Sequence, residues 1–448
     1  MIYNLAWRIY WGSSHNFSFL LFLIGTLMRS LLLASSAILT LSSLASAQSA
    51  RDVIDGYADL AFVMYGDSLA GAVTLQSAID TFVAAPGPAT FDAAKSAWLA
   101  SRVPYQQTEV YRFGNAYVDD WEGKVNAWPL DEGLIDYVDT SFYGSESEEN
   151  DFFLANVVAN ADLMVAGQAI DASEITAGLL QSLHEVDGVE ANVATGYHAV
   201  EFLLWGQDLN GSAPGAGART YSDYLTGEAC TNGNCDRRAA YLKAATDLLV
   251  ADLEDIVAAW DAGGEARVAL DEAADGEALS VILTGMGSLS YGELAGERMQ
   301  LGLLLHDPEE EHDCFADNTH NSHFYDIIGI QNVYLGQYTA TDGSQVTVPS
   351  LSSLVAAVDT QLDAEVQAKL SATVAAAGLL KVEADSGRQA YDQMIGADNP
   401  AGNALVQNTI DALIEQTRSI ERVVASLDIA SIEFEGSDSL DNPGAVFE

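Results

Sequence analysis

Apolar residues recur every three or four positions along most of the chain, which is the spacing of one face of an α-helix. From Arg51 to Val83 they form one stripe, which ends at Pro86-Gly87-Pro88. Strand-like alternation is confined to residues 338–348, around Asp342-Gly343, and predicts a short β-hairpin. The helical spacing predicts further helices over residues 90–101, 173–205, 236–260, 265–305, 352–377, 381–395 and 401–427, with another helix starting at Pro104.

These elements predict an all-α protein of two up-and-down helical bundles with a short β-hairpin. The segment 210–219, rich in Gly, Pro, Ala and Ser, is the predicted linker between the bundles. It separates a first bundle, residues 48–209, from a second bundle, residues 220–430. Residues 431–448 are expected to form a loose acidic tail. Residues 131–151 carry eight acids and no base, which predicts a surface loop.

The N-terminal region has the order of features found in a secretory signal peptide. Arg29 precedes the apolar run 31–44, and Ala45-Ser46-Ala47 follows as a small-residue cleavage signature. Residues 1–47 are therefore the predicted signal region. Either Met28 is the true start, or the residues before it are removed together with the signal. The mature protein is predicted to be soluble in the periplasm or held at a surface by other means.

Charge excludes one large class of functions. The 448 residues include 18 Lys and Arg against 65 Asp and Glu, a formal net charge of −47. Such a chain would be repelled by the phosphates of a nucleic acid, so no nucleic-acid partner is expected. Because 49% of the residues are hydrophobic, the chain is also too apolar for a disordered acidic protein.

Two of the three cysteines are close together. Cys230 and Cys235 flank the turn sequence TNGN, and Cys314 stands alone. In an exported protein a local disulfide between the pair is the expected arrangement. The alternative, a metal site, lacks four nearby ligands.

The motif Gly196-Tyr197-His198-Ala199-Val200-Glu201 carries the most specific chemistry. On a helix, His198 and Glu201 are one turn apart on one face and can approach one ion together. Helical bundles hold iron, manganese or zinc with this pairing of imidazole and carboxylate. The alternative is a buried His–Glu hydrogen bond that holds no metal.

Further ligands are expected from other helices. In a continuous helix His184 would lie roughly 21 Å from His198 along the axis, which excludes it. For each acidic candidate named below, the alternative is that its carboxylate is simply solvated or paired with a base. The segment 309–320 is rich in ligand atoms, but we expect it mainly to cap the next helix through Asp317 or Asn318. Glu109 is the candidate further ligand, and the candidate supporting residues are Gly196, Glu293, Glu297 and Arg298.

Four stretches together resemble the imelysin family, in its iron-regulated protein A-like branch. They are the GxHxxE motif at 196–201, CTNGNCDRRAAYLKAATDLL at 230–249, GELAGERM at 292–299 and DPEEEHDCFADNTHNS at 307–322. The resemblance implies two bundles related by duplication, a metal-binding GxHxxE site near their interface, a periplasmic or outer-membrane-associated location and a link to iron uptake. Gly196, His198 and Glu201 match the family motif, and Glu109 and Arg298 fall in its other characteristic stretches.

The expected function is binding of a divalent or ferric metal ion, iron or zinc, by His198, Glu201 and Glu109, with possible partners in the outer membrane or in iron uptake. One alternative is a metallopeptidase, the activity for which the family was named, with Glu201 as the catalytic base. A zinc peptidase needs about three protein ligands, and the motif supplies one His and one Glu. The other alternative is a metal-free module that binds a peptide or an iron complex.

Overall fold

The computed structural model describes residues 48–165 and 167–447. From residue 48 onward the chain folds into one compact unit. The predicted signal region, 1–47, and the expected start at Met28 lie outside the described residues. No helix in the described part is long and apolar enough to cross a bilayer.

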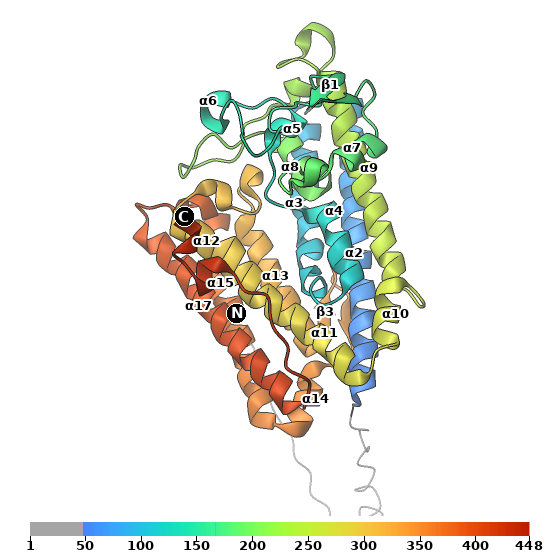
Figure 1. Ribbon diagram of the computed structural model, residues 1–448, viewed down its shortest axis with the longest axis vertical. Helices are drawn as coiled ribbons and strands as arrows, with labels where there is room; N and C mark the ends of the chain where they lie inside the picture. Colours follow the sequence, from blue (N-terminus) through green and yellow to red (C-terminus); the bar gives the residue numbers. More distant parts are fainter. Residues whose placement is uncertain (1–47, 166, 448) are drawn as a thin grey trace, which may run out of the picture. The chain divides into compact units, whose positions relative to one another are not determined.

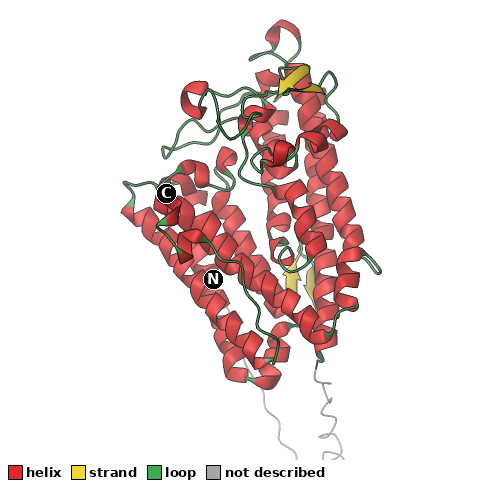
Figure 2. Cartoon of the chain, in the orientation of Figure 1, coloured by secondary structure: helices red, strands yellow, loops and turns green. Residues whose placement is uncertain are grey.

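Helices dominate the described residues (Figures 1 and 2), which confirms the all-α prediction. The central long helix runs without interruption from α11 through a π-helical stretch at Leu289–Gln300 into α12. The helices are α2 (Ala50–Ala84), α3 (Pro88–Gln106), α4 (Ala116–Asn126), α5 (Glu132–Ile135), α6 (Thr140–Tyr143), α7 (Ala177–Leu183), α8 (Gly196–Trp205), α9 (Cys235–Trp260), α10 (Glu265–Asp271), α11 (Asp275–Ser288), α12 (Leu301–Leu305), α13 (Thr319–Leu335), α14 (Leu351–Val358), α15 (Thr360–Asp385), α16 (Tyr391–Ile395), α17 (Pro400–Ser426) and α18 (Asp438–Asp441).

Two antiparallel hairpins accompany these helices. β3 (Gln337–Thr339) pairs with β4 (Gln345–Thr347), as the alternation around Asp342-Gly343 predicted. β1 (Asp162–Val165) pairs with β2 (Gln168–Asp171), and this second hairpin was not predicted. Its strands are four residues each.

The first group of helices packs around α2, which lies along α3 and α9 (Figure 1). Close approach to α3 is possible because Gly71 has no side chain: a Cβ there would lie 3.2 Å from Ser101 Cα and 3.5 Å from Pro104 Cγ. The predicted helix start at Pro104 is wrong, because α3 continues through Pro104 to Gln106. A proline in the last turn removes only one internal hydrogen bond, so the helix persists there.

The second group contains α11, the π-helical stretch, α13, α15 and α17 (Figure 1). The Gln416 side chain of α17 donates to Ser290 Oγ in the π-helical stretch at 2.7 Å, inside the core. α9 follows the predicted linker at 210–219, yet it packs on α2, which precedes that segment. The division into two domains at 210–219 stays a prediction, and the two groups of helices meet where α3 packs against α13.

The acidic segment 131–151 is more than a surface loop. It contains α5 and α6, and its Asp136 carboxylate is buried between two guanidinium groups, at 2.7 Å from Arg219 Nη1 and 2.5 Å from Arg238 Nε. Composition could not show this, because the two partners lie roughly a hundred residues downstream in the chain.

The predicted loose tail also packs against the protein. Backbone and side chains of residues 434–437 lie over the glycines of the central long helix: added Cβ atoms at Gly287, Gly292 and Gly296 would be 2.3 to 2.6 Å from Phe434, Glu435 and Ser437. Ser439 Oγ donates to the Gly296 carbonyl at 3.0 Å. These glycines let the C-terminal segment approach the helix backbone directly.

Candidate functional site

The GxHxxE motif begins a helix rather than lying inside one. The predicted helix 173–205 is interrupted: α7 ends at Leu183, and α8 starts at Gly196. Gly196 has φ +79°, and a Cβ on it would lie 2.5 Å from the Val125 carbonyl oxygen. Only glycine combines that backbone conformation with that closeness to the end of α4, so Gly196 fixes where α8 starts.

His198 and Glu201 meet on one face of α8, as their spacing predicted. His198 Nδ1 lies 3.0 Å from Glu201 Oε2, and both side chains are fully buried. The other oxygen, Glu201 Oε1, accepts the backbone N–H of Ala316 at 2.9 Å. Through the contact with Nδ1, Glu201 is placed to orient the His198 ring.

A second histidine and an aspartate complete the cluster. The rings of His198 and His312 lie edge to face with centroids 4.7 Å apart, and Asp313 Oδ1 is 4.0 Å from His198 Nδ1 and 3.4 Å from His312 Nδ1. One ligand atom from each of the three residues lies within 4.8 Å of the other two. We call these three residues the histidine cluster. Among the described residues, this is the group whose geometry could hold a metal ion.

Sequence reasoning missed His312 and Asp313 because it assigned their segment to helix capping. Asn318 is the N-cap residue of α13, but its side chain makes no cap hydrogen bond and instead donates to Asp313 Oδ2 at 2.7 Å. The expected capping role of that side chain is therefore wrong. The high density of ligand atoms in 309–320 was the available signal.

A buried arginine holds the cluster in place. Arg102 on α3 donates through Nη2 to Asp313 Oδ1 at 2.7 Å and through Nη1 to Asn126 Oδ1 at 2.6 Å. Its guanidinium lies 4.9 Å from the centroid of the Tyr197 ring. This residue joins α3, α4 and α8 to the segment that carries His312 and Asp313.

The electrostatics leave the imidazoles neutral and Asp313 charged. Burial, with Arg102 nearby, lowers the pKa of His198 to about 3, and burial likewise holds the pKa of His312 well below its usual value. Burial alone would raise the pKa of Asp313, but the Arg102 guanidinium, together with the neighbouring His312 and His198, outweighs burial and holds that pKa well below the usual range. Burial and the neighbouring Asp313 charge raise the pKa of Glu201 well above its ordinary value. Neutral imidazole and ionised carboxylate are the forms that bind metals.

The donor set of the histidine cluster fits a transition metal. The Nε2 atoms of His198 and His312 are both buried and have no hydrogen-bond partner within the described part of the chain. Two imidazoles and one carboxylate suit non-haem iron(II) or zinc.

The other predicted residues gather around a different arginine. Arg298 in the π-helical stretch is buried and pairs with Glu109 at 2.9 Å, Glu293 at 2.6 Å and Asp326 at 3.2 Å. The histidine cluster does not include Glu109, whose carboxylate is already neutralised there. Glu297, from the same motif, is partly exposed.

His184 lies nearer the motif than a continuous helix would allow. The chain turns between α7 and α8, and His184 Nδ1 is 3.3 Å from Thr195 Oγ1, beside the first residue of α8. The distance that excluded it assumed one straight helix, so that argument is wrong. His184 is still not part of the histidine cluster.

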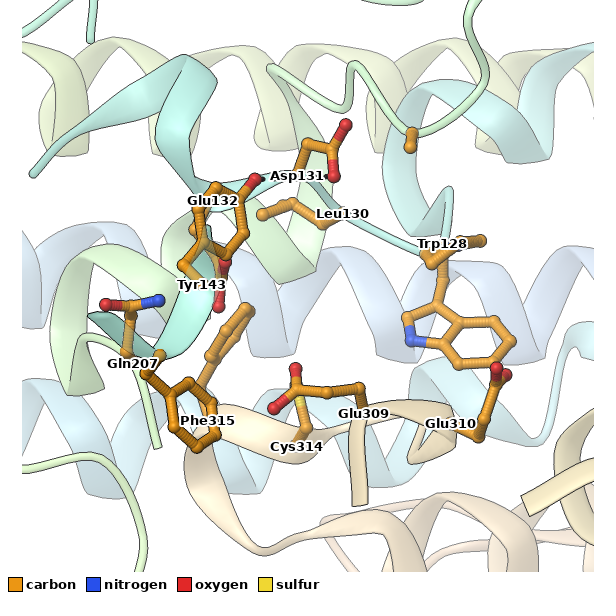
Figure 3. Close-up of a pocket in the computed structure, with 13 residues that line it drawn as sticks. Trp128, Leu130, Asp131, Glu132, Tyr143, Gln207, Glu309, Glu310, Cys314 and Phe315 are labelled. Carbon is orange, nitrogen blue, oxygen red and sulfur yellow. Dashed lines mark hydrogen bonds between the residues drawn. The ribbon is translucent and has the colours of Figure 1, made fainter. Parts of the chain in front are cut away.

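Two cavities adjoin the cluster, with Trp128 lining both. A polar groove of about 540 Å³ is lined by His312 and by acids that include Glu122, Glu185 and Glu190. A pocket of about 320 Å³ combines aromatic and acidic side chains; Glu132, Tyr143 and Gln207 lie on one side of it and Trp128 and Glu310 on the other (Figure 3). The groove reaches the His312 side of the cluster, although the His312 side chain itself is buried.

A family model described as Imelysin (Peptidase_M75) matches residues 61–420, most of the chain. The chain belongs to the imelysin family. The match includes the GxHxxE motif and every residue of the histidine cluster.

Two relatives of this imelysin carry iron-related names. Iron-regulated protein A of Synechococcus elongatus is 36% identical over 86 residues, which are 19% of this chain and 24% of the relative. The match thus spans about a quarter of that curated protein. A crystal structure described as an iron-regulated protein A precursor from Parabacteroides distasonis has the same fold, with a TM-score of 0.60 at 16% identity over 86% of this chain and 97% of that chain.

Replacing Asp313 by Asn should destabilise the protein by roughly 3–5 kcal/mol, because Arg102 would be left buried without an anion. Urea unfolding measures this change. The control is Glu383→Gln, which breaks the surface pair with Arg388 and should cost less than about 1 kcal/mol. Equal costs for the two variants would contradict the role given to the buried pair.

Proposed function

We propose that this imelysin binds one transition metal ion, iron or zinc, through His198, His312 and Asp313. The observation that carries the proposal is that one ligand atom from each of the three residues lies within 4.8 Å of the other two. Each buried ring also has an Nε2 with no hydrogen-bond partner among the described residues. A buried imidazole nitrogen without a partner is costly in a metal-free core. Coordination of a cation would remove that cost.

Glu201 is a positioning residue in this proposal. Burial and the Asp313 charge raise the pKa of Glu201, and a bound cation would offset both effects. The ionised Glu201 would then accept the Nδ1–H of His198, which fixes the tautomer and leaves the Nε2 lone pair free. Arg102 orients Asp313 in the same way from the other side. The bound ion would supply Lewis acidity or an open coordination position, and the residues named here hold and orient it.

The connection to iron uptake rests on the names of the relatives. Both are described as iron-regulated protein A or its precursor, and the donor set suits iron(II). We infer that this chain serves in the handling of iron outside the cytoplasm, with an outer-membrane or iron-uptake protein as its partner. The acidic groove beside His312 would concentrate cations near the site.

Metal analysis and calorimetry with Fe²⁺ and Zn²⁺ test the site. His312→Ala should abolish stoichiometric binding, and Glu201→Gln should weaken it by about 10- to 100-fold, the usual cost of losing a group that orients a ligand. His306→Ala, a histidine outside the cluster, should bind as the unaltered protein does. Equal uptake by His312→Ala and His306→Ala would remove the proposed site.

A metallopeptidase is the second candidate, supported by the three candidate ligands of the histidine cluster, where the motif alone offered one His and one Glu. This activity requires cleavage of an unfolded polypeptide that is lost with a chelator and restored by Zn²⁺. Glu201→Gln should abolish the cleavage if Glu201 is the base. Metal binding without any cleavage would leave only the binding function.

If the protein instead binds a ligand without metal, a chelator should have no effect on that binding. A peptide or an iron complex would then raise the thermal midpoint by the same amount with and without chelator. Metal-dependent stabilisation at the histidine cluster would contradict it.

We also propose that the protein is exported and loses residues 1–47. N-terminal sequencing of the protein recovered from the periplasm should give Gln48 as the first residue. A mature end upstream of Arg29 would contradict this proposal.

A further inference from the structure

The pocket in Figure 3 presents aromatic rings and carboxylates to a space of about 320 Å³. In Figure 3, the Glu309 carboxylate lies between Phe315 and Trp128, and Glu132 of α5 lies beside Tyr143 of α6. Among the described residues that line the pocket, none is Lys, Arg or His. The pocket is therefore negatively charged and has no cation of its own.

Glu132 is the most deeply buried of these acids. Its side chain lines the pocket, the residue is 5% exposed, and no cation is among the groups that act most on its charge. Burial and the Glu309 charge raise the pKa of Glu132 to about 8, which the Gln207 side chain only partly offsets, and burial raises the pKa of Glu309 to about 7. The other charged groups that act on these two carboxyls are all acids: Asp131, Asp208, Asp307 and Glu310. A cation in the pocket would stabilise the ionised form of both carboxyls.

The aromatic walls of the pocket are held in place by the protein. The Tyr143 ring stacks on Phe153 with centroids 4.2 Å apart, and its hydroxyl donates to Asp131 Oδ1 at 3.3 Å. The Phe315 ring packs against Phe202 with centroids 5.3 Å apart. Because the walls are already ordered, a ligand would meet a largely preformed site, which lowers the cost of binding.

Elsewhere, the chain neutralises a buried acid with an arginine that lies on an aromatic ring. The Arg219 guanidinium is 4.8 Å from the centroid of the Tyr137 ring and 2.7 Å from the Asp136 carboxylate. The ring and the carboxylate thus attract the same planar cation. The pocket offers rings and carboxylates of the same kind, but the guanidinium is missing.

The spacing of the pocket's acids favours an organic cation over a metal ion. Among the described residues, the histidine cluster is the group whose ligand atoms are close enough to share one ion, and the acids of the pocket do not form such a group. A guanidinium spreads its N–H donors around the edge of a plane, so it can contact carboxylates that are well separated. Its flat face also stacks on an aromatic ring, whereas an ammonium group is a compact, strongly hydrated charge.

We propose that this pocket binds an alkylguanidinium, the group that an arginine side chain carries. The cation lies against an aromatic wall and donates from its edge to Glu132 and Glu309. Its source is a small guanidinium compound or an arginine of a peptide. This inference does not depend on the transition-metal site, because the pocket and the histidine cluster share no residue.

Calorimetry with butylguanidinium chloride tests the proposal at about pH 8.5, where both carboxyls are largely ionised. One molecule should bind, with a Kd of roughly 0.1–1 mM for a ligand of about eight heavy atoms. Butylurea has nearly the same shape but no charge, and it should not bind. A chelator should leave the binding unchanged.

Glu132→Gln removes the buried charge and keeps the size of the side chain. This variant should bind butylguanidinium at least tenfold more weakly, and Glu309→Gln should also weaken binding. Glu148→Gln is the matched control, because Glu148 is an exposed acid of the same acidic segment that does not line the pocket. It should bind as the unaltered protein does. An unchanged circular dichroism spectrum shows that each variant is folded.

Two capped tripeptides distinguish the sources of the guanidinium. They are acetyl-Gly-Arg-Gly-amide and the same peptide with neutral citrulline in place of arginine. Tighter binding of the arginine peptide than of butylguanidinium supports a peptide ligand, and weaker binding supports a small compound. The citrulline peptide should not bind in either case.

Three outcomes would overturn the guanidinium site. They are no binding of either guanidinium probe, equal binding of butylurea, and undiminished binding by Glu132→Gln. A pocket whose carboxyls are simply protonated and hydrated would give the first result. Failure of Zn²⁺ binding with intact guanidinium binding would instead count only against the histidine cluster.

Discussion

The buried ion pair between Arg102 and Asp313 is the constraint on which the candidate site depends. It connects α3, in the first group of helices, to the segment that precedes α13 in the second group. Both side chains are at most 1% exposed, so neither can be released to water without unfolding its surroundings. A buried pair of this kind contributes little net stability but strongly penalises arrangements that separate the partners. It thereby fixes the position of His312 relative to His198.

Other buried arginines repeat this arrangement elsewhere in the protein. Arg238 and Arg219 hold Asp136, and Arg298 holds Glu109 and two further acids. Each planar guanidinium can satisfy several acceptors at once, which suits a position where two or three elements meet. The large negative charge of the chain is therefore uneven: some acids are neutralised by buried arginines, and many others lie on the surface.

The helices could be predicted because their signal is local. Apolar spacing gave α2, α9 and α17 nearly to the residue, and the hairpin of β3 and β4 followed from alternation around Asp342-Gly343. The break before Gly196 was missed, since apolar spacing continues on both sides of it and the cause, the approach of Val125, comes from another helix.

Half of the candidate site could be predicted, because only that half depends on local spacing along the chain. His198 and Glu201 share one turn of helix, so spacing alone placed them together. His312 and Asp313 reach them from more than a hundred residues downstream, through Arg102, and no local pattern reports such a contact. Glu109 was a reasonable acid to test, but a sequence cannot show that its charge is used by Arg298.

Every cation that is buried in the described ion pairs is an arginine, while all five lysines of the chain are at least partly exposed. Amine-directed chemistry, such as acylation, fluorescent labelling or coupling to a support, would therefore reach the surface alone. It would make an already acidic exterior more negative and leave the internal ion pairs intact.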